Sequence, residues 1–121
     1  MNTQEVARKV VELVRNKAWY DALDLYDEDI VSVEAYPGPS GSPETRGKQG
    51  LRGKIDWWVK AMEIHNFNAS EPFVGHDRFV VQYDADVTEK ESKQRRQLSE
   101  VGVYTVQNGK IVREEFLPRL D

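Results

Sequence analysis

Three glutamates and one histidine are the residues of this chain whose types and positions suggest proton-transfer chemistry. Glu34 stands near the end of the β-branched run "DEDIVSVEAY", just before a segment rich in proline and glycine. Glu100 and Glu114 lie in two later apolar segments, and His65 opens the segment "HNFNA". Carboxylates that share a cavity repel one another and lose water, so at least one of them should keep its proton near neutral pH. An acid and a base would then coexist, as general acid–base catalysis requires.

The carboxylates also have a structural interpretation. Strand alternation predicts that Val31, Val33 and Ala35 are buried, which would leave Ser32 and Glu34 in water. Glu100 and Glu114 could equally be surface charges in "SEVG" and "REEF". A slip of one residue in the register of the last strand would replace Glu114 by Glu115.

His65 and the aromatic residues leave the same choice open. Phe67 and Ala69 follow His65 at strand spacing and are expected to share its face. A single histidine on an apolar face is more often a hydrogen-bonded core residue than a catalyst. The aromatic residues can fill the core or line a site for a hydrophobic ligand; they are Trp57, Trp58, Phe67, Tyr83, Tyr104 and Phe116.

The composition excludes several classes of protein. The chain has 121 residues, which fits one domain, and a formal net charge of −4, which argues against a nucleic-acid partner. It has no cysteine and only two histidines, so we expect no metal, and the proposed chemistry needs no cofactor. No apolar run is long enough to span a membrane, and the beginning of the chain has no signal-peptide pattern, so we expect a cytoplasmic protein.

The elements that must position these residues follow from hydrophobic periodicity. The spacing predicts helices at 3–15, 17–26 and 48–61, with a strand after the second helix and an irregular loop at 37–46. Four strands follow, and the last two are joined at Asn108-Gly109, a strong signal for a tight hairpin turn. This order predicts an α+β domain whose helices cover one face of a curved, mainly antiparallel sheet.

Three segments in this order resemble the nuclear-transport-factor-2-like superfamily and its SnoaL-like and ketosteroid isomerase-like members. They are "WYDALDLYDEDIVSVEAYPG", "RGKQGLRGKIDWW" and "VYTVQNGKIVREEF". The resemblance covers residues 1–121 as a single SnoaL-like domain and implies a cone-shaped fold that encloses a cavity. It places Glu34 where the isomerase has its general-base carboxylate, and it places Val10 and Gly102 where that enzyme has its oxyanion donors. In scytalone dehydratase, a relative in this superfamily, a cavity histidine works with acidic partners, which favours a functional role for His65.

The resemblance implies two functions from different classes. One is a cofactor-independent isomerase, cyclase or dehydratase that acts on a small hydrophobic molecule, with Glu34, His65 and Glu100 as its catalytic residues. Glu114 and the six aromatic residues named above would bind the substrate. The other is a non-catalytic ligand-binding or dimerisation module of the same fold. We also expect a homodimer, because Val101, Val103 and Ile111 are predicted on the face opposite the cavity, and we expect the loop at 37–46 to lie beside the cavity entrance.

Overall fold

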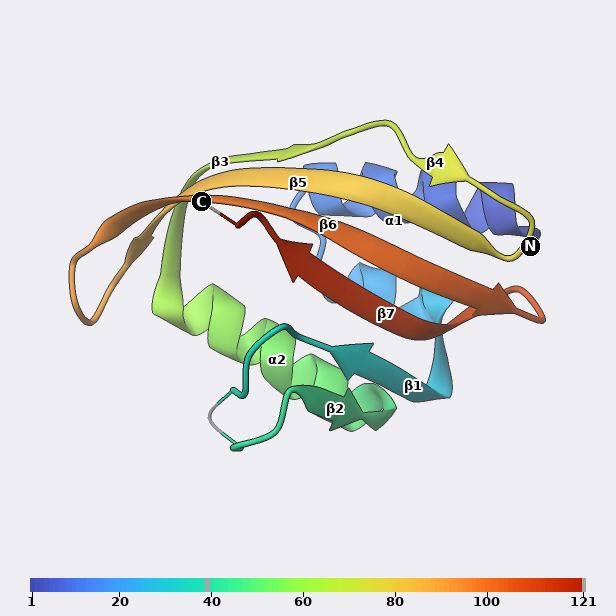
Figure 1. The fold of residues 1–121 in the computed structure, drawn as a ribbon, viewed down its shortest axis with the longest axis horizontal. Helices are drawn as coiled ribbons and strands as arrows, with labels where there is room; N and C mark the ends of the chain where they lie inside the picture. Colours follow the sequence, from blue (N-terminus) through green and yellow to red (C-terminus); the bar gives the residue numbers. More distant parts are fainter. Residues whose placement is uncertain (39, 121) are drawn as a thin grey trace.

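A computed structural model describes residues 1–38 and 40–120 of the chain. Helix α1 (Thr3–Arg15), a short 3-10 helix η1 (Asp21–Leu25) and strand β1 (Tyr26–Val33) come first, followed by β2 (Glu44–Arg46) and helix α2 (Gly47–Ala61). The remaining strands are β3 (Met62–Ala69), β4 (Phe73–Val74), β5 (Arg78–Glu89), β6 (Arg95–Gln107) and β7 (Lys110–Pro118) (Figure 1). The predicted α+β class is confirmed.

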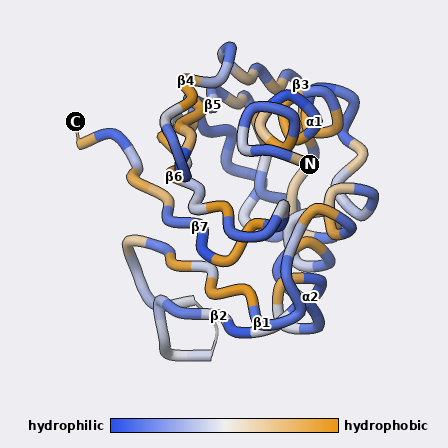
Figure 2. Tube along the Cα trace, turned by 90° about the vertical axis from the view of Figure 1, so that its right-hand side faces the viewer, coloured by the Kyte–Doolittle hydropathy of each residue, from blue (hydrophilic) through white to orange (hydrophobic). Residues whose placement is uncertain are grey.

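The strands form one sheet in the order β2-β1-β7-β6-β5-β3, with β4 paired to β5. The β1–β7 pair is parallel, and the other neighbours are antiparallel. Figure 2 shows α1 and α2 on one side of the long curved strands. Because β1 and β7 run in the same direction, Ser32 and Glu114 become register partners although they are far apart in sequence.

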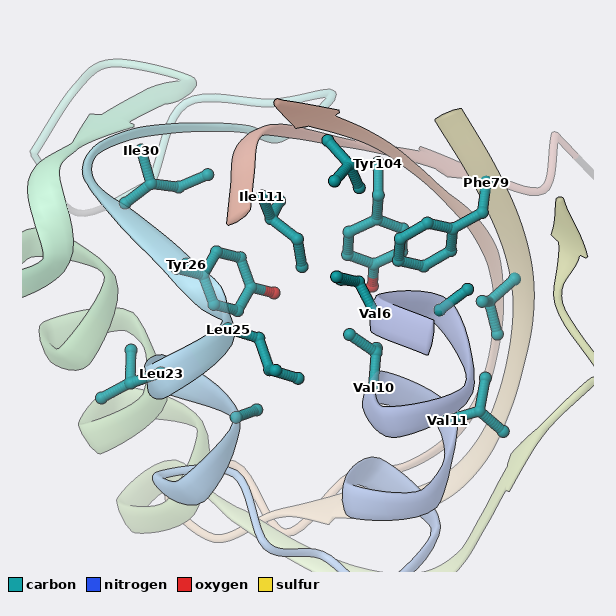
Figure 3. Packing of buried hydrophobic residues seen from close by; sticks show 14 of the residues in the cluster. Val6, Val10, Val11, Leu23, Leu25, Tyr26, Ile30, Phe79, Tyr104 and Ile111 are labelled. Carbon is teal, nitrogen blue, oxygen red and sulfur yellow. The ribbon is translucent and has the colours of Figure 1, made fainter. Parts of the chain in front are cut away.

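Helix α1 is fixed by its cap and by one apolar stripe. The Asn2 side chain accepts from the Glu5 amide at 2.8 Å, and the Glu5 carboxylate accepts from the Asn2 amide at 3.0 Å, so two amides of the helix start are satisfied. Val6 and Val10 are at most 1% exposed and pack against the sheet (Figure 3). The periodicity of this helix is therefore realised as predicted.

The core joins α1 to the inner face of the strands. Ile30, Phe79 and Ile111 are its most enclosed large residues, and the Phe79 ring stacks on Tyr104 with centroids 4.6 Å apart. In Figure 3 the hydroxyls of Tyr26 and Tyr104 both point into the interior, although they come from strands β1 and β6. The core therefore contains polar groups that β1 and β6 bring toward each other.

Three local predictions were wrong. The helix expected at 17–26 is only the 3-10 helix η1, and Tyr26 begins β1. The loop expected at 37–46 contains β2, which pairs with β1 through Val33 and Glu44; Pro39 lies outside the described residues. Ala35 is exposed, because β1 buries Ile30 and Ser32 in place of Val31 and Val33.

Ile111 corrects the expected dimer face. It is fully buried in the core, whereas the prediction placed it on the outer face with Val101 and Val103. The register of β6 and β7 shifts between Thr105 and Val106, and this irregularity changes the alternation along β7. Simple alternation could not find this shift.

Candidate functional site

The site is centred on Glu114, a buried glutamate in the middle of β7. Its side chain is 2% exposed, and both carboxylate oxygens accept hydrogen bonds from strand β1. Tyr26 donates to Oε1 at 2.5 Å, and Ser32 donates to Oε2 at 2.6 Å. Burial raises the pKa of Glu114, while the hydrogen bonds from Ser32 and Tyr26 act in the opposite direction. The two hydroxyl donors therefore compensate part of the cost of a buried carboxylate.

Lys54 connects this buried group to Glu34. The lysine projects from α2 and donates to the Ser32 hydroxyl at 2.7 Å and to Glu34 Oε2 at 2.6 Å. Its side chain is 27% exposed, and the Glu34 side chain is 40% exposed. The ammonium also lies 5.6 Å from the centre of the Phe116 ring. A continuous polar chain thus runs from the partly exposed Glu34 to the buried Glu114.

The Glu34 side chain is neither fully solvated nor fully enclosed in the interior. It follows the last residue of β1, on the same face as the buried Ser32, and its amide donates to the Pro43 carbonyl at 2.8 Å. The carboxylate points toward Lys54 and keeps part of its surface in water. Glu34 is therefore at the rim of the polar cluster.

Glu100 is the carboxyl group without a protein partner in this region. It is half-buried on β6, on the face that also carries Gly102 and Tyr104, and no hydrogen bond or ion pair to it is found among residues 1–38 and 40–120. Burial is the main cause that raises its pKa to about 7, and the charge of Glu34 adds to the rise while Lys54 opposes it. Near neutral pH this group can therefore hold or release a proton.

Two tyrosine hydroxyls lie deeper in the same interior. Tyr83 and Tyr104 come from neighbouring strands, and their oxygens are 2.6 Å apart. Burial raises the pKa of both phenols, so both hydroxyls stay protonated. A Cβ atom at Gly102 would lie 2.9 Å from the Tyr104 ring and 3.1 Å from the Tyr83 ring. Glycine at this position is what allows the two rings to converge.

Aromatic rings form one wall beside this cluster. Trp19 contacts both Trp58 and Phe67 edge to face, with centroids 6.3 and 4.9 Å apart. Phe67 in turn lies 5.7 Å from Tyr83. Trp57 is half exposed on α2 and makes no aromatic contact in the described part of the chain. Trp58 is therefore part of this wall, whereas Trp57 is not.

His65 does not join the glutamates. It sits at the surface, where its Nε2 lies 2.7 Å from the Thr88 hydroxyl. The pairing of β3 with β5 shifts between Ile64 and Asn66, so His65 is turned away from the face of Phe67. The expectation that His65 points inward is therefore wrong.

The structure fixes the register of β7 and adds residues to the site that no sequence pattern indicated. Glu114 is buried and Glu115 is not, as the first of the two registers predicted. Tyr26, Ser32 and Lys54 were not selected as site residues. The sequence left Glu114 and Glu115 as alternatives, and only the parallel pairing with β1 shows which hydroxyls reach Glu114.

Two hollows open on the surface of the molecule, and neither is lined by Glu34, Lys54 or Glu114. One of about 460 Å³ is bordered by α1 and the segment after β3, including Arg8, Arg15 and Glu71. The other, of about 180 Å³, is bordered by Glu100 and by Gln82, Val101 and Leu117, which lie on the outer face of the sheet. Within the described ranges no group of three or more histidine or acidic side chains could hold a metal ion, and no helix is long and apolar enough to cross a membrane.

Comparisons with known proteins agree with this architecture. A protein from Mesorhizobium loti assigned as a SnoaL-like polyketide cyclase is 37% identical, with a TM-score of 0.89, and the match covers 97% of this chain and 99% of that chain. A Bacillus subtilis protein assigned as an isomerase is 22% identical, with a TM-score of 0.78 and coverage of 98% and 90%.

An NTF2-like protein from Burkholderia xenovorans is 16% identical, with a TM-score of 0.80 and coverage of 98% and 92%. The matches to the Bacillus subtilis and Burkholderia xenovorans proteins, at 22% and 16% identity, show a similar fold only. No curated protein matches the chain. The SnoaL-like domain model matches residues 1–117, and the chain therefore belongs to the SnoaL-like family.

Proposed function

We propose that this protein is a cofactor-independent isomerase, cyclase or dehydratase that moves protons on a small hydrophobic molecule in the cytoplasm. Glu34 is the base and Glu100 is the acid. The observation that carries the proposal is the half-buried Glu100 carboxyl, which has no protein partner in the described chain and stands near the Lys54–Glu34 pair. An unpaired, partly desolvated carboxyl group is costly for stability, so it marks a position where a ligand is expected to supply the missing partner.

The geometry gives each group a distinct task. Glu34 Oε2 accepts from Lys54, and Oε1 has no donor among the described residues, which leaves it available to a substrate C–H or O–H. Glu100 returns a proton when it is in its neutral form. The ring of Phe116 and the wall formed by Trp58, Phe67 and Tyr83 would exclude water around an apolar substrate. His65 is too far to the outside of the sheet to be the donor in this scheme.

A second function, ligand binding without catalysis, is supported by the residues at the two positions where the isomerase has its oxyanion donors. Val10 is an apolar core residue, and Gly102 carries no side chain, so neither position provides a donor to a developing enolate. Each missing donor can cost about 3 kcal/mol of transition-state stabilisation. A protein that only binds a hydrophobic ligand in the same interior is therefore the alternative.

Deuterium exchange at carbon separates the two functions. Wild-type protein in D₂O should accelerate the loss of α-proton NMR signals from at least one hydrophobic cyclic ketone in a small panel, compared with buffer containing the same concentration of free carboxylate. Acceleration is expected because a positioned base contributes about 100-fold or more. Ligand resonances that shift on binding without any exchange would support the binding module and contradict the enzyme.

We further propose that the protein is a homodimer through the outer face of the sheet. Val80 is a direct register partner of Val103, and Val101 is a partner of Leu117, which is 52% exposed. Gln82 and Glu115 share this face with the four apolar side chains, and an apolar group of this kind favours contact with a second copy.

Light scattering at micromolar concentration should give twice the chain mass. The variant Val103→Lys should give a monomer, because a charge would be buried in the interface. The matched variant Val59→Lys, on the outside of α2, should remain a dimer. A wild-type protein that is a stable monomer would contradict the proposal.

A further inference from the structure

We infer that Glu114 is a positioning residue for the proposed base: it acts through Ser32 and Lys54 to hold the Glu34 carboxylate in place. The inference rests on the proposed function of Glu34 and adds the device that orients it. Glu114 itself is buried beneath Ser32, and its two oxygens are occupied by Ser32 and Tyr26. It is therefore placed to act on Glu34 without contact to a ligand.

Lys54 and Glu114 fix the direction of the hydrogen bonds that connect them through Ser32. The Lys54 ammonium can only donate, so the Ser32 oxygen must accept from it. Ser32 has one proton, and the Glu114 carboxylate is the acceptor that it reaches, at 2.6 Å. Tyr26 supplies the donor to the other oxygen of the same carboxylate. As the acceptor of the Ser32 proton, Glu114 thus sets the orientation of the Ser32 hydroxyl.

The orientation of Ser32 matters because it determines where Lys54 can sit. With its proton directed to Glu114, Ser32 presents lone pairs to the ammonium at 2.7 Å. The same ammonium reaches Glu34 at 2.6 Å, and its position over the Phe116 ring fixes it from a third side. Glu34 lies beyond the end of β1, where the strand no longer constrains the side chain. Lys54 is therefore the group that restrains the Glu34 carboxylate.

Burial makes the hydrogen-bonded cluster of Tyr26, Ser32 and Glu114 rigid. Ser32 is fully buried, Glu114 is 2% exposed and Tyr26 is 8% exposed, so water does not compete for their hydrogen bonds. A buried carboxylate is strongly destabilising unless its partners are retained, and no buried side-chain polar atom of the described residues lacks a partner. An apolar residue, which has no charge to desolvate, could fill the position of Glu114 if packing were its only role. The connection to Lys54 explains why a carboxylate stands there.

The test compares Glu114→Gln with Glu115→Gln, the neighbouring residue on the same strand. Glutamine at 114 would place an amide donor against either Tyr26 or Ser32, so the Ser32 proton loses its acceptor or its orientation. We expect water exchange of the Lys54 ammonium protons, followed by ¹⁵N-edited NMR, to be about 10-fold faster in Glu114→Gln, which corresponds to the loss of about one hydrogen bond. Glu115→Gln should match the wild type.

Two further variants show which hydrogen bond controls the exchange of the Lys54 ammonium protons. Ser32→Ala removes only a hydroxyl and should speed the ammonium exchange as much as Glu114→Gln, which keeps the test valid if the latter fails to fold. Tyr26→Phe leaves the Ser32–Lys54 branch intact and should have a smaller effect. In deuterium exchange of a ketone, Ser32→Ala should lower the turnover rate about 10-fold and leave KM within about twofold of the wild type.

The outcomes separate this inference from the proposed function. If the wild-type protein does not catalyse exchange at carbon, the proposed function fails, and the ammonium NMR still decides whether Glu114 controls Lys54. If the wild type is active and folded Ser32→Ala keeps both the wild-type rate and the wild-type ammonium exchange, the positioning role is overturned.

Discussion

Replacing Glu100 by glutamine is expected to raise the free energy of unfolding at pH 8 by about 3 kcal/mol and to leave it nearly unchanged at pH 4. Glutamine resembles the protonated carboxyl in shape and charge. In the folded wild type the pKa of Glu100 is raised from 4.5 to about 7, mainly by burial. Ionisation of the half-buried group therefore costs the folded state free energy that the unfolded chain does not lose.

The sign of the pH dependence follows from the raised pKa. The contribution of Glu100 to stability is fully present below pH about 4.5 and is lost as the pH rises through about 7. Urea unfolding of wild type and Glu100→Gln at pH 4 and at pH 8 isolates this contribution, because the other glutamates are common to both proteins. Glu115→Gln is the control: its free energy of unfolding should differ from that of the wild type by the same amount at pH 4 and at pH 8. A constant difference between wild type and Glu100→Gln at both pH values would show that Glu100 is solvated.

The elements that depend on local pattern could be predicted from the sequence. Helix α1 has both a capping box and an apolar stripe, and the structure begins it at Thr3 as expected. The Asn108-Gly109 turn has φ values of 51° and 76°, which these two residue types tolerate. Agreement between several local signals is what made these predictions succeed.

The errors arise where pairing in space overrides local pattern. Tyr26 fits a helical spacing with Trp19 and Leu23, but parallel pairing with β7 extends β1 to include it. Irregularities in the β3–β5 and β6–β7 pairs turned His65 outward and Ile111 inward. A one-residue irregularity changes the face of every residue beyond it, and no local signal marks its position.

The candidate site was predicted in part for the same reasons. The sequence left the orientation of Glu100 and Glu114 open; in the structure Glu100 lies on the face of Gly102 and Glu114 on the inner face of β7. Lys54 could not be selected, since an isolated lysine on an amphipathic helix is usually solvated, and its acceptors come from β1. Ser32 was expected in water because valines flank it, yet its hydroxyl is buried against Glu114. The polar chain exists only in the tertiary arrangement.

Replacing Glu34, the proposed base, by glutamine has the largest effect that we expect. The variant keeps the shape of the side chain and replaces the basic carboxylate by a neutral amide, so exchange of substrate α-protons should fall by about 100- to 10,000-fold. Binding of the ketone should change much less, because the aromatic wall of Trp58, Phe67 and Tyr83 is untouched.

The most direct measurement is the deuterium-exchange rate of Glu34→Gln beside that of Glu44→Gln under saturating ketone. Glu44 is a matched control: its side chain is also 40% exposed and is also paired with a basic residue, Arg46, at 3.1 Å. We expect a loss of at least about 100-fold for Glu34→Gln and a rate within about twofold of the wild type for Glu44→Gln. An active wild type whose rate survives Glu34→Gln would contradict the assignment of Glu34 as the base.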